Sequence, residues 1–270
     1  MGIERLSVRG IDLEVLRKGH GSPILLLHGL HTVDPEAPFL DLLAARAEII
    51  APSHPGFGHS PRPADFDTVY DLVHLYLDLL EQLHERVTLM GLSFGGWLAA
   101  EIAAARSPRV ERLILVDAVG IKVGDRETPD ILDVFNTSPA EVRRRRWHEP
   151  AKWAPDPDAL SNEALIAHAR NREALCLYAW HPYMYNPRLT HWLNRVAVPT
   201  LVVWGEEDQL IPLSVGKKIQ DGIPDSSLVV IDGCGHLAPL ECSKPVAEAT
   251  EKFLRAPQPV RANESALASH

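Results

Sequence analysis

The sequence predicts an α/β fold, in which helices flank a mainly parallel sheet. Continuous apolar runs such as Ile24–Leu27 recur along the chain, and such runs are typical of strands buried on both faces of a parallel sheet. Helical patterns lie between the runs, and strands that alternate with helices form parallel units. The 270 residues suffice for one sizeable core, with room for a subdomain but not for a second large domain.

The strands can be assigned in chain order. Alternating apolar and polar residues over Glu4–Val8 and Leu13–Lys18 predict an antiparallel pair that turns at Gly10. The buried runs that follow predict the rest of the sheet. They are Ile24–Leu27, Glu48–Pro52, Val87–Gly91, Arg112–Ala118, Thr200–Gly205 and Ser227–Gly233.

Three segments have helical patterns. In Thr68–Leu83 the apolar residues recur at helical spacing along one face. Ser93–Arg106 is rich in alanine and ends near Pro108, because proline does not continue a helix. Lys244–Leu254 is the last predicted helix.

The stretch 120–196 interrupts this alternation. It contains no buried-strand run, and prolines divide it into short helices and loops. We interpret it as a helical insertion over one end of the sheet; a plain helical connection with its own small core is the alternative. The predicted core is then 1–119 with 197–256, and the small polar residues of 257–270 predict a disordered tail. Eight aromatic residues lie in the insertion: Phe135, Trp147, Trp153, Tyr178, Trp180, Tyr183, Tyr185 and Trp192.

Composition excludes several classes of protein. A net charge of −9 argues against a partner that is a nucleic acid or an anionic membrane, and no apolar stretch is long enough to span a bilayer. Cys176, Cys234 and Cys242 cannot all pair and have no CxxC spacing, which favours a reducing compartment over a disulfide scaffold. Charged residues occupy the N-terminus where a signal peptide needs an apolar run, so we expect a cytoplasmic protein.

The stretch MGLSFGGWLAA, Met90–Ala100, places Ser93 between Gly91 and Gly95, after a buried strand and at the start of a helix. A serine in such a tight turn has a strained backbone, and its hydroxyl projects beyond the sheet edge. Only very small residues fit two positions before and after it. The helix N-terminus adds N–H groups and a positive dipole end that favour developing negative charge. The pattern predicts a nucleophile; a helix-capping serine is the alternative.

A serine nucleophile needs a base, and the base needs a carboxylate. His236 lies in DGCGHLAPLE, Asp232–Glu241, directly after the last predicted strand. Because ligands bind at the carboxyl ends of parallel strands, this loop is where a base is required. Asp208 follows the preceding strand and is the favoured carboxylate. Asp117 also ends a strand and is its rival; the neighbours Glu206 and Glu207 are more simply solvated.

The loop after Ile24–Leu27 is the expected source of a second oxyanion donor. The backbone N–H groups of Leu30 and Phe94 are the predicted pair. His28 is expected to order this loop. His31 either contacts the substrate or is simply a loop residue. We expect no metal, since the histidine spacing fits no HExxH arrangement.

These motifs in this order resemble the α/β-hydrolase superfamily over nearly the whole chain. The matching segments are LLLHG at 25–29, APSHPGFGHS at 51–60, GLSFGG at 91–96, VPTLVVWGEED at 198–208 and CGHLAPLE at 234–241. The resemblance implies an eight-stranded, mostly parallel sheet, a helical cap at 120–196, no cofactor, a serine-bound acyl intermediate, and a monomer or homodimer. Ser93 excludes haloalkane dehalogenases and epoxide hydrolases, which need aspartate at that position.

Two enzyme classes remain open on the resemblance. Meta-cleavage-product hydrolases, which split carbon–carbon bonds in dienoic diketo acids, share the SFGG elbow, but they usually have tryptophan where this chain has Leu237. They also bind the substrate acid with a cap arginine. Enol-lactonases and esterases share the overall pattern. Three candidates for that arginine cannot be ranked: Arg172, Arg188 and Arg195. The run Arg143–Arg146 is interpreted as a solvated helix face.

We expect hydrolysis of a small or medium carboxylic ester or lactone by Ser93, Asp208 and His236. Carbon–carbon hydrolysis with the same three residues is the alternative. A ligand-binding module with little turnover is a rival from another class, although a pure binder needs no base. Apolar residues should select an alkyl or aromatic acyl group. The candidate pocket residues are His31, Trp97, Trp147, Trp180, Tyr183 and Met184.

Overall fold

The computed structural model describes residues 2–125, 127–156 and 159–257. The tail predicted at 257–270 lies, apart from Pro257, outside these residues. Within the described part, no helix is both long enough and apolar enough to cross a bilayer.

One eight-stranded sheet forms the centre of the molecule, in the order β1-β2-β4-β3-β5-β6-β7-β8. β2 runs antiparallel to β1 and β4, and the other neighbouring strands pair in parallel. The predicted mostly parallel sheet is therefore confirmed. The strands are β1 Gly2–Val8, β2 Ile11–Gly19, β3 Ser22–Leu27, β4 Ala47–Pro52, β5 Val87–Leu92, β6 Val110–Val116, β7 Thr200–Gly205 and β8 Ser226–Ile231.

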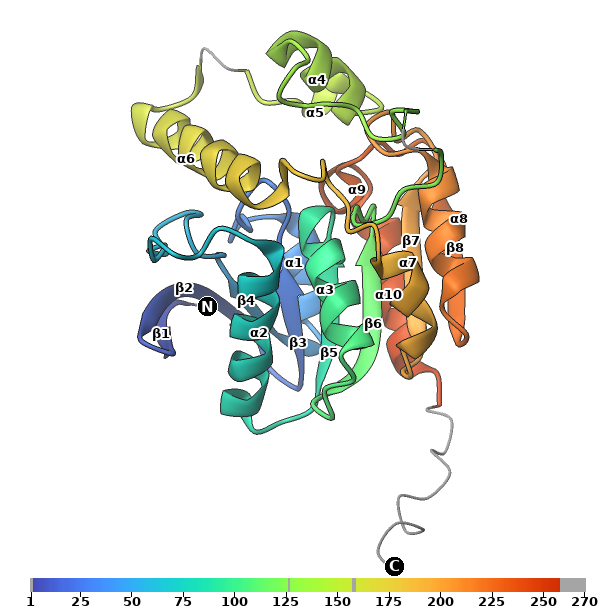
Figure 1. Cartoon of the computed structure of the whole chain (residues 1–270). Coiled ribbons are helices and arrows are strands. Elements are labelled where there is room, and N and C mark those ends of the chain that lie inside the picture. Colours follow the sequence, from blue (N-terminus) through green and yellow to red (C-terminus); the bar gives the residue numbers. More distant parts are fainter. Residues whose placement is uncertain (1, 126, 157–158, 258–270) are drawn as a thin grey trace, which may run out of the picture.

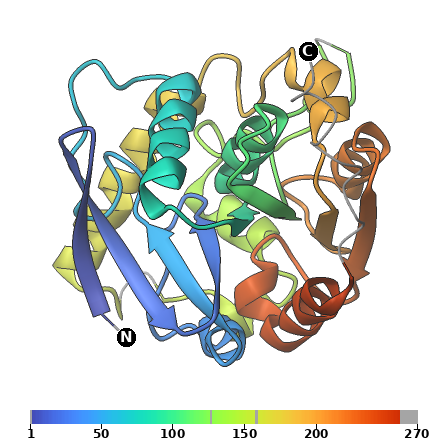
Figure 2. The same cartoon turned by 90° about the horizontal axis from the view of Figure 1, so that it is seen from below.

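Helices cover both faces of the sheet (Figures 1 and 2). The side chains of each strand alternate between two buried clusters: Leu25 and Leu27 belong to one, Ile24 and Leu26 to the other. The first cluster lies under α2, α3 and α8, and the second under α1 and α10. The bounds are α1 Pro38–Ala44, α2 Val69–Leu83, α3 Phe94–Ala104, α8 Leu213–Gly222, α9 Ala238–Glu241 and α10 Ser243–Arg255.

Local signals explain where the helices begin. Thr68, the predicted first residue of α2, is its N-cap: its hydroxyl accepts the Asp71 N–H, and the Asp71 carboxylate accepts the Thr68 N–H at 2.9 Å. Helices α1 and α8 were not predicted from the sequence. α1 has only seven residues, which is too short for a periodic pattern to stand out.

One expectation about the strands is wrong. The apolar run at Ser227–Gly233 does not form a strand buried on both faces, because β8 is the last strand of the sheet and Val230 is 39% exposed. An edge strand has a neighbour on one side only, and a continuous apolar run does not reveal that position.

In the stretch 120–196, which we call the helical insertion, α4, α5 and α6 lie above the sheet edge at which the parallel strands end, whereas α7 runs down beside the sheet (Figure 1). Gly120 and Tyr185 form an isolated bridge where the chain leaves and returns. The C-terminal half of α6 packs inward through Leu175 and Tyr178, whereas Leu165 and Ile166 in its first turns are exposed. Its helices are α4 Pro139–Arg146, α5 Pro150–Trp153, α6 Asn162–Ala179, α7 Leu189–Trp192 and the 3₁₀ turn Leu193–Arg195.

Close approach of α3 to the sheet gives a first prediction. A Cβ atom at Gly95 would overlap the backbone carbonyl groups of Leu27 and His28, which cannot yield as a flexible side chain would. We expect Gly95→Ala to lower the free energy of unfolding by about 1–3 kcal/mol or more, measured by urea denaturation. The control is Gly2→Ala, where nothing lies within 4 Å of the added Cβ. Equal stability of the two variants would contradict this account.

Candidate active site

Ser93 has the strained backbone that its sequence context predicts. Its φ of 50° and ψ of −112° are rare for a residue with a side chain, and it stands between β5 and α3. Gly91 makes the turn possible, because a Cβ there would lie 2.6 Å from Gly96 Cα. The Ser93 side chain makes no capping hydrogen bond to α3, which argues against the alternative of a helix-capping serine.

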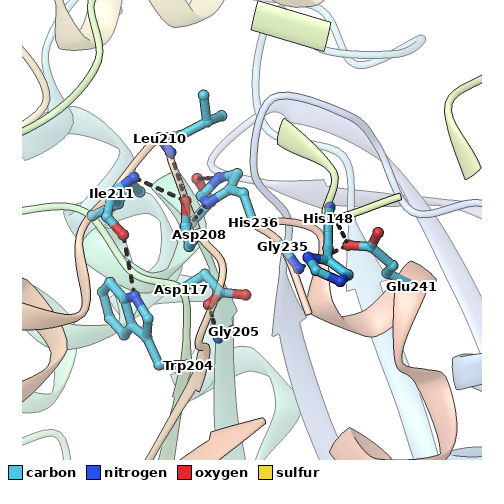
Figure 3. Close-up of polar contacts among 11 residues, drawn as sticks. Asp117, His148, Trp204, Gly205, Asp208, Leu210, Ile211, Gly235, His236 and Glu241 are labelled. Atoms are coloured by element: carbon cyan, nitrogen blue, oxygen red, sulfur yellow. Dashed lines mark hydrogen bonds and ion pairs between the residues drawn. The ribbon is translucent and has the colours of Figure 1, made fainter. Parts of the chain in front are cut away.

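The three predicted catalytic side chains lie together. His236 Nε2 is 3.0 Å from Ser93 Oγ, and His236 Nδ1 is 2.7 Å from Asp208 Oδ2. The second Asp208 oxygen accepts the N–H groups of Leu210 and Ile211 (Figure 3). A carboxylate that accepts from Nδ1–H leaves Nε2 free to accept the serine proton. This arrangement can activate a hydroxyl for attack on a carbonyl carbon.

Asp117, the rival carboxylate, occupies a different place. Its Oδ1 accepts the Gly205 N–H at 2.8 Å, and its buried Oδ2 has no hydrogen-bond partner among the described residues (Figure 3). Burial, followed by the neighbouring Asp208, raises the pKa of Asp117 well above its usual range. Asp208, in contrast, has the bond to His236. Glu206 is exposed and Glu207 half-buried.

The oxyanion loop is held against Ser93 by a histidine pair. Gly29 lies so close that a Cβ there would be 3.1 Å from Ser93 Cβ, and both Leu30 and Phe94 line the cavity beside Ser93. His28 Nε2 accepts the His54 N–H at 3.0 Å, and the two rings lie in contact, tilted by 31° with centroids 3.8 Å apart. Burial lowers the pKa of His28 to about 4. The neutral His28 ring therefore orders this loop, as its position in the sequence suggested.

A cavity of about 220 Å³ opens next to Ser93 and His236. His31, Tyr183 and Met184 line it, in agreement with the pocket prediction. The Tyr183 hydroxyl donates to Leu132 O and accepts the Val134 N–H, so only its ring is free for apolar contact. Much of the remaining wall is apolar: Leu40, Val119, Ile131, Val134, Leu210, Ile211 and Leu240.

Three predicted pocket residues lie elsewhere. Trp97 extends along α3, where its indole N–H donates to Glu101, and it faces a second cleft. Trp147 is buried behind the cavity, and Trp180 is 52% exposed, packed edge-on against Phe135. Composition identified the insertion as aromatic, but it could not say which rings point inward.

Arg146 corrects a further expectation. The run Arg143–Arg146 is not a uniformly solvated face: Arg143 and Arg144 are exposed, whereas the half-buried Arg146 lines the Ser93 cavity. Successive helical residues are turned by about 100°, so four in a row cannot share one face. In the sequence, the large apolar residue Trp147 directly after the run was the available signal that this end of the run faces the interior, and Trp147 is indeed buried.

None of the three arginines proposed from the sequence lines this cavity. Arg172 stacks on Phe135 and donates to Val134 O, and Arg195 donates to Ala104 O. Arg188 is exposed.

The Arg146 guanidinium faces neutral partners. Its Nη1 lies 2.9 Å from His31 Nε2, and the His31 ring stacks on His168 at 5.3 Å. Burial and then Arg146 lower the pKa of His31 to about 3, so His31 accepts the guanidinium N–H as a neutral ring. Burial lowers the pKa of Arg146 to about 10, which still leaves it charged near pH 7. Among the described residues, no carboxylate forms an ion pair with it.

No group of three or more His, Cys, Asp or Glu side chains in the described ranges is arranged to hold a metal ion.

The two carboxylates should differ sharply in mutagenesis. Asp208→Asn removes the charge that orients His236 and should lower kcat on p-nitrophenyl acetate by about 10³- to 10⁴-fold. Asp117→Asn alters a carboxyl that accepts the Gly205 N–H and is not the partner of His236 Nδ1, so a change below about 10-fold is expected. If Asp117→Asn were the more damaging, the assignment of Asp208 as the partner of His236 would be wrong.

Comparison with known proteins agrees with this geometry. Residues 24–249 match the model of the Alpha/beta hydrolase family. The chain is 30% identical to a 2-hydroxymuconate semialdehyde hydrolase of Pseudomonas sp. (strain CF600), over 91% of each chain. It is 29% identical to a poly(3-hydroxyalkanoate) depolymerase of Ectopseudomonas oleovorans, over 88% of this chain and 86% of that one.

Solved structures show the same fold. A meta-cleavage product hydrolase from Pseudomonas fluorescens superposes with a TM-score of 0.74 at 22% identity, covering 93% of this chain and 97% of that one. The ordered sheet, the turn at Ser93 and these likenesses agree, and the chain belongs to the alpha/beta hydrolase family, as a hydrolase.

Proposed function

We propose that this enzyme hydrolyses a small substrate that carries a carboxylate, by attack of Ser93 on a carbonyl carbon. The observation that carries the proposal is Arg146, a cation in the wall of the Ser93 cavity with no carboxylate partner among the described residues. Partial burial of a charged group costs desolvation free energy unless a counter-ion binds to it. A carboxylate fits a guanidinium, and the apolar remainder of the wall suits the rest of such a molecule.

The reaction begins with proton transfer. His236 takes the Ser93 proton while Asp208 stabilises the resulting imidazolium, and Oγ attacks the carbonyl carbon. The tetrahedral oxyanion is stabilised by the N–H groups of Leu30 and Phe94. Next, the bond to the leaving group breaks. The leaving group takes the proton from His236, and water then hydrolyses the acyl-enzyme with His236 again as base.

A carbon–carbon bond is the favoured target, in place of the ester or lactone that the sequence alone suggested. A relative 30% identical is a 2-hydroxymuconate semialdehyde hydrolase, and meta-cleavage-product hydrolases, which the sequence resembles, split dienoic diketo acids. Arg146 supplies the acid-binding side chain that such a substrate needs. In this case the departing carbon keeps the electron pair, delocalised along the dienoate, and is protonated by His236.

An ester remains the second candidate, supported by the poly(3-hydroxyalkanoate) depolymerase relative and by Leu237, which lines the cavity where the carbon–carbon hydrolases usually have tryptophan.

A fluorophosphonate probe tests the nucleophile. We expect it to label Ser93, as mapped by mass spectrometry, and labelling to be lost in Ser93→Ala and His236→Ala. Ser93→Ala should lower kcat by several orders of magnitude on dienoic keto acids and p-nitrophenyl esters alike, with the circular dichroism spectrum unchanged. If the enzyme turned over esters but no keto acid, an ester would be favoured over a carbon–carbon bond as the target of the reaction.

Arg146 is tested by comparing a charged with a neutral substrate. Arg146→Gln should raise KM for a carboxylate-bearing substrate by about 30- to 5,000-fold, since truncating one partner of a buried charge pair costs about 2–5 kcal/mol. The kcat/KM for p-nitrophenyl acetate should change by less than about 3-fold. The control is Arg144→Gln, a second arginine of the segment Arg143–Arg146. The Arg144 guanidinium forms an ion pair with Glu141 at the protein surface. Equal losses on both substrates would refute a carboxylate-binding role.

A further inference from the structure

Two segments that are distant in the sequence meet at one buried carboxylate. The His236 loop follows β8, and residues 146–149 join the end of α4 to the start of α5 in the helical insertion. The Glu241 side chain reaches the backbone of both segments, at Gly235 and at His148 (Figure 3). Its Oε2 accepts the Gly235 N–H at 2.8 Å and the His148 N–H at 3.1 Å, and its Oε1 accepts the Glu149 N–H at 2.8 Å. Glu241 is 8% exposed.

The same two segments are also in direct contact. The His236 N–H donates to the Arg146 carbonyl at 2.9 Å. Gly235 permits this approach, since a Cβ there would lie 2.6 Å from His148 N and 2.8 Å from Arg146 O. The backbone of the base is thus bonded to the backbone of the arginine that lines its cavity.

We propose that Glu241 is a positioning residue that fixes His236 and Arg146 relative to each other. The part concerning His236 rests on the geometry of its loop alone; the part concerning Arg146 rests on the proposed function. Glu241 touches neither side chain in this arrangement and acts through the backbone on either side of them. One carboxylate thereby aligns the base that reacts with Ser93 and the cation that receives the substrate.

The chemistry of the three contacts explains why a carboxylate is suited to this place. All three partners are backbone N–H donors, and an ionised carboxylate accepts at both oxygens. Bonds of this charge-assisted type are stronger than those between neutral groups. A glutamine of the same shape has one oxygen and one NH₂ group, so it must lose at least one bond and face an N–H with a donor.

Amide hydrogen exchange is the direct test. Glu241→Gln should speed exchange at Gly235, His148 and Glu149 together, while the amides of β5 and β6 keep their protection. The matched control is Glu149→Gln, in the same segment, whose side chain is exposed and pairs with Lys152. That variant should leave all of these amides unchanged. Exchange that rises across the whole sheet would mean a general loss of stability and would overturn the proposal.

Kinetics provides the second readout. The rate of Ser93 labelling by a fluorophosphonate, which needs no carboxylate site, should fall by about 10- to 100-fold in Glu241→Gln, because His236 is displaced. With an acid-bearing substrate, KM should rise as well. A merely structural role would lower the active fraction, with KM and the labelling rate of the remaining sites unaltered.

A second variant reaches the same contact by different chemistry. Gly235→Ala keeps the Glu241 side chain but places a Cβ 2.6 Å from His148 N, 2.8 Å from Arg146 O and 2.9 Å from Glu241 Oε2. It therefore disturbs the same contact from the side of the His236 loop, and it should reproduce the labelling defect and the local exchange. If neither variant slows labelling, the positioning role is refuted. If labelling slows but KM for the acid is unchanged in both, His236 is positioned as proposed, and it is the assignment of Arg146 that fails.

Discussion

The close approach of α3 to β3 and β5 is the constraint on which the site depends. Because Gly91 and Gly95 have no side chains, the helix can begin directly at the sheet edge, and Ser93 is held in a backbone conformation that residues with side chains rarely adopt. That turn directs its hydroxyl toward His236 instead of toward the helix end. The loops after β7 and β8 end on the same side of the sheet, so Asp208 and His236 reach it without further distortion.

Burial decides which groups around the cavity are charged. It lowers the pKa of His28 to about 4 and of His31 to about 3, and it raises the pKa of Asp117 well above its usual range. His28 and His31 are therefore neutral near pH 7. Arg146, with a pKa of about 10, remains a cation. The cavity wall is thus largely apolar, with the Arg146 cation at one place and the exposed Asp34 at another.

The helical insertion is joined to the catalytic loop by more than apolar packing. Glu241 and the backbone of His236 both bind the segment 146–149, which joins α4 to α5. Arg146 in this segment accepts the His236 N–H with its carbonyl and lines the cavity with its side chain. The loop that carries His236 and the wall of the cavity are therefore joined by one set of hydrogen bonds.

The sequence by itself predicted the eight-stranded sheet, the strained turn at Ser93 and the meeting of Ser93 with His236, because period, glycine spacing and strand ends are local signals. It left Asp117 as a rival, since both aspartates end strands, and only burial and hydrogen bonding separate them. It misplaced Trp97, Trp147 and Trp180 and overlooked Arg146 and Glu241. The direction of a side chain in an irregular helical segment depends on contacts with residues about 90 to 115 positions away, and only the tertiary structure brings those residues together.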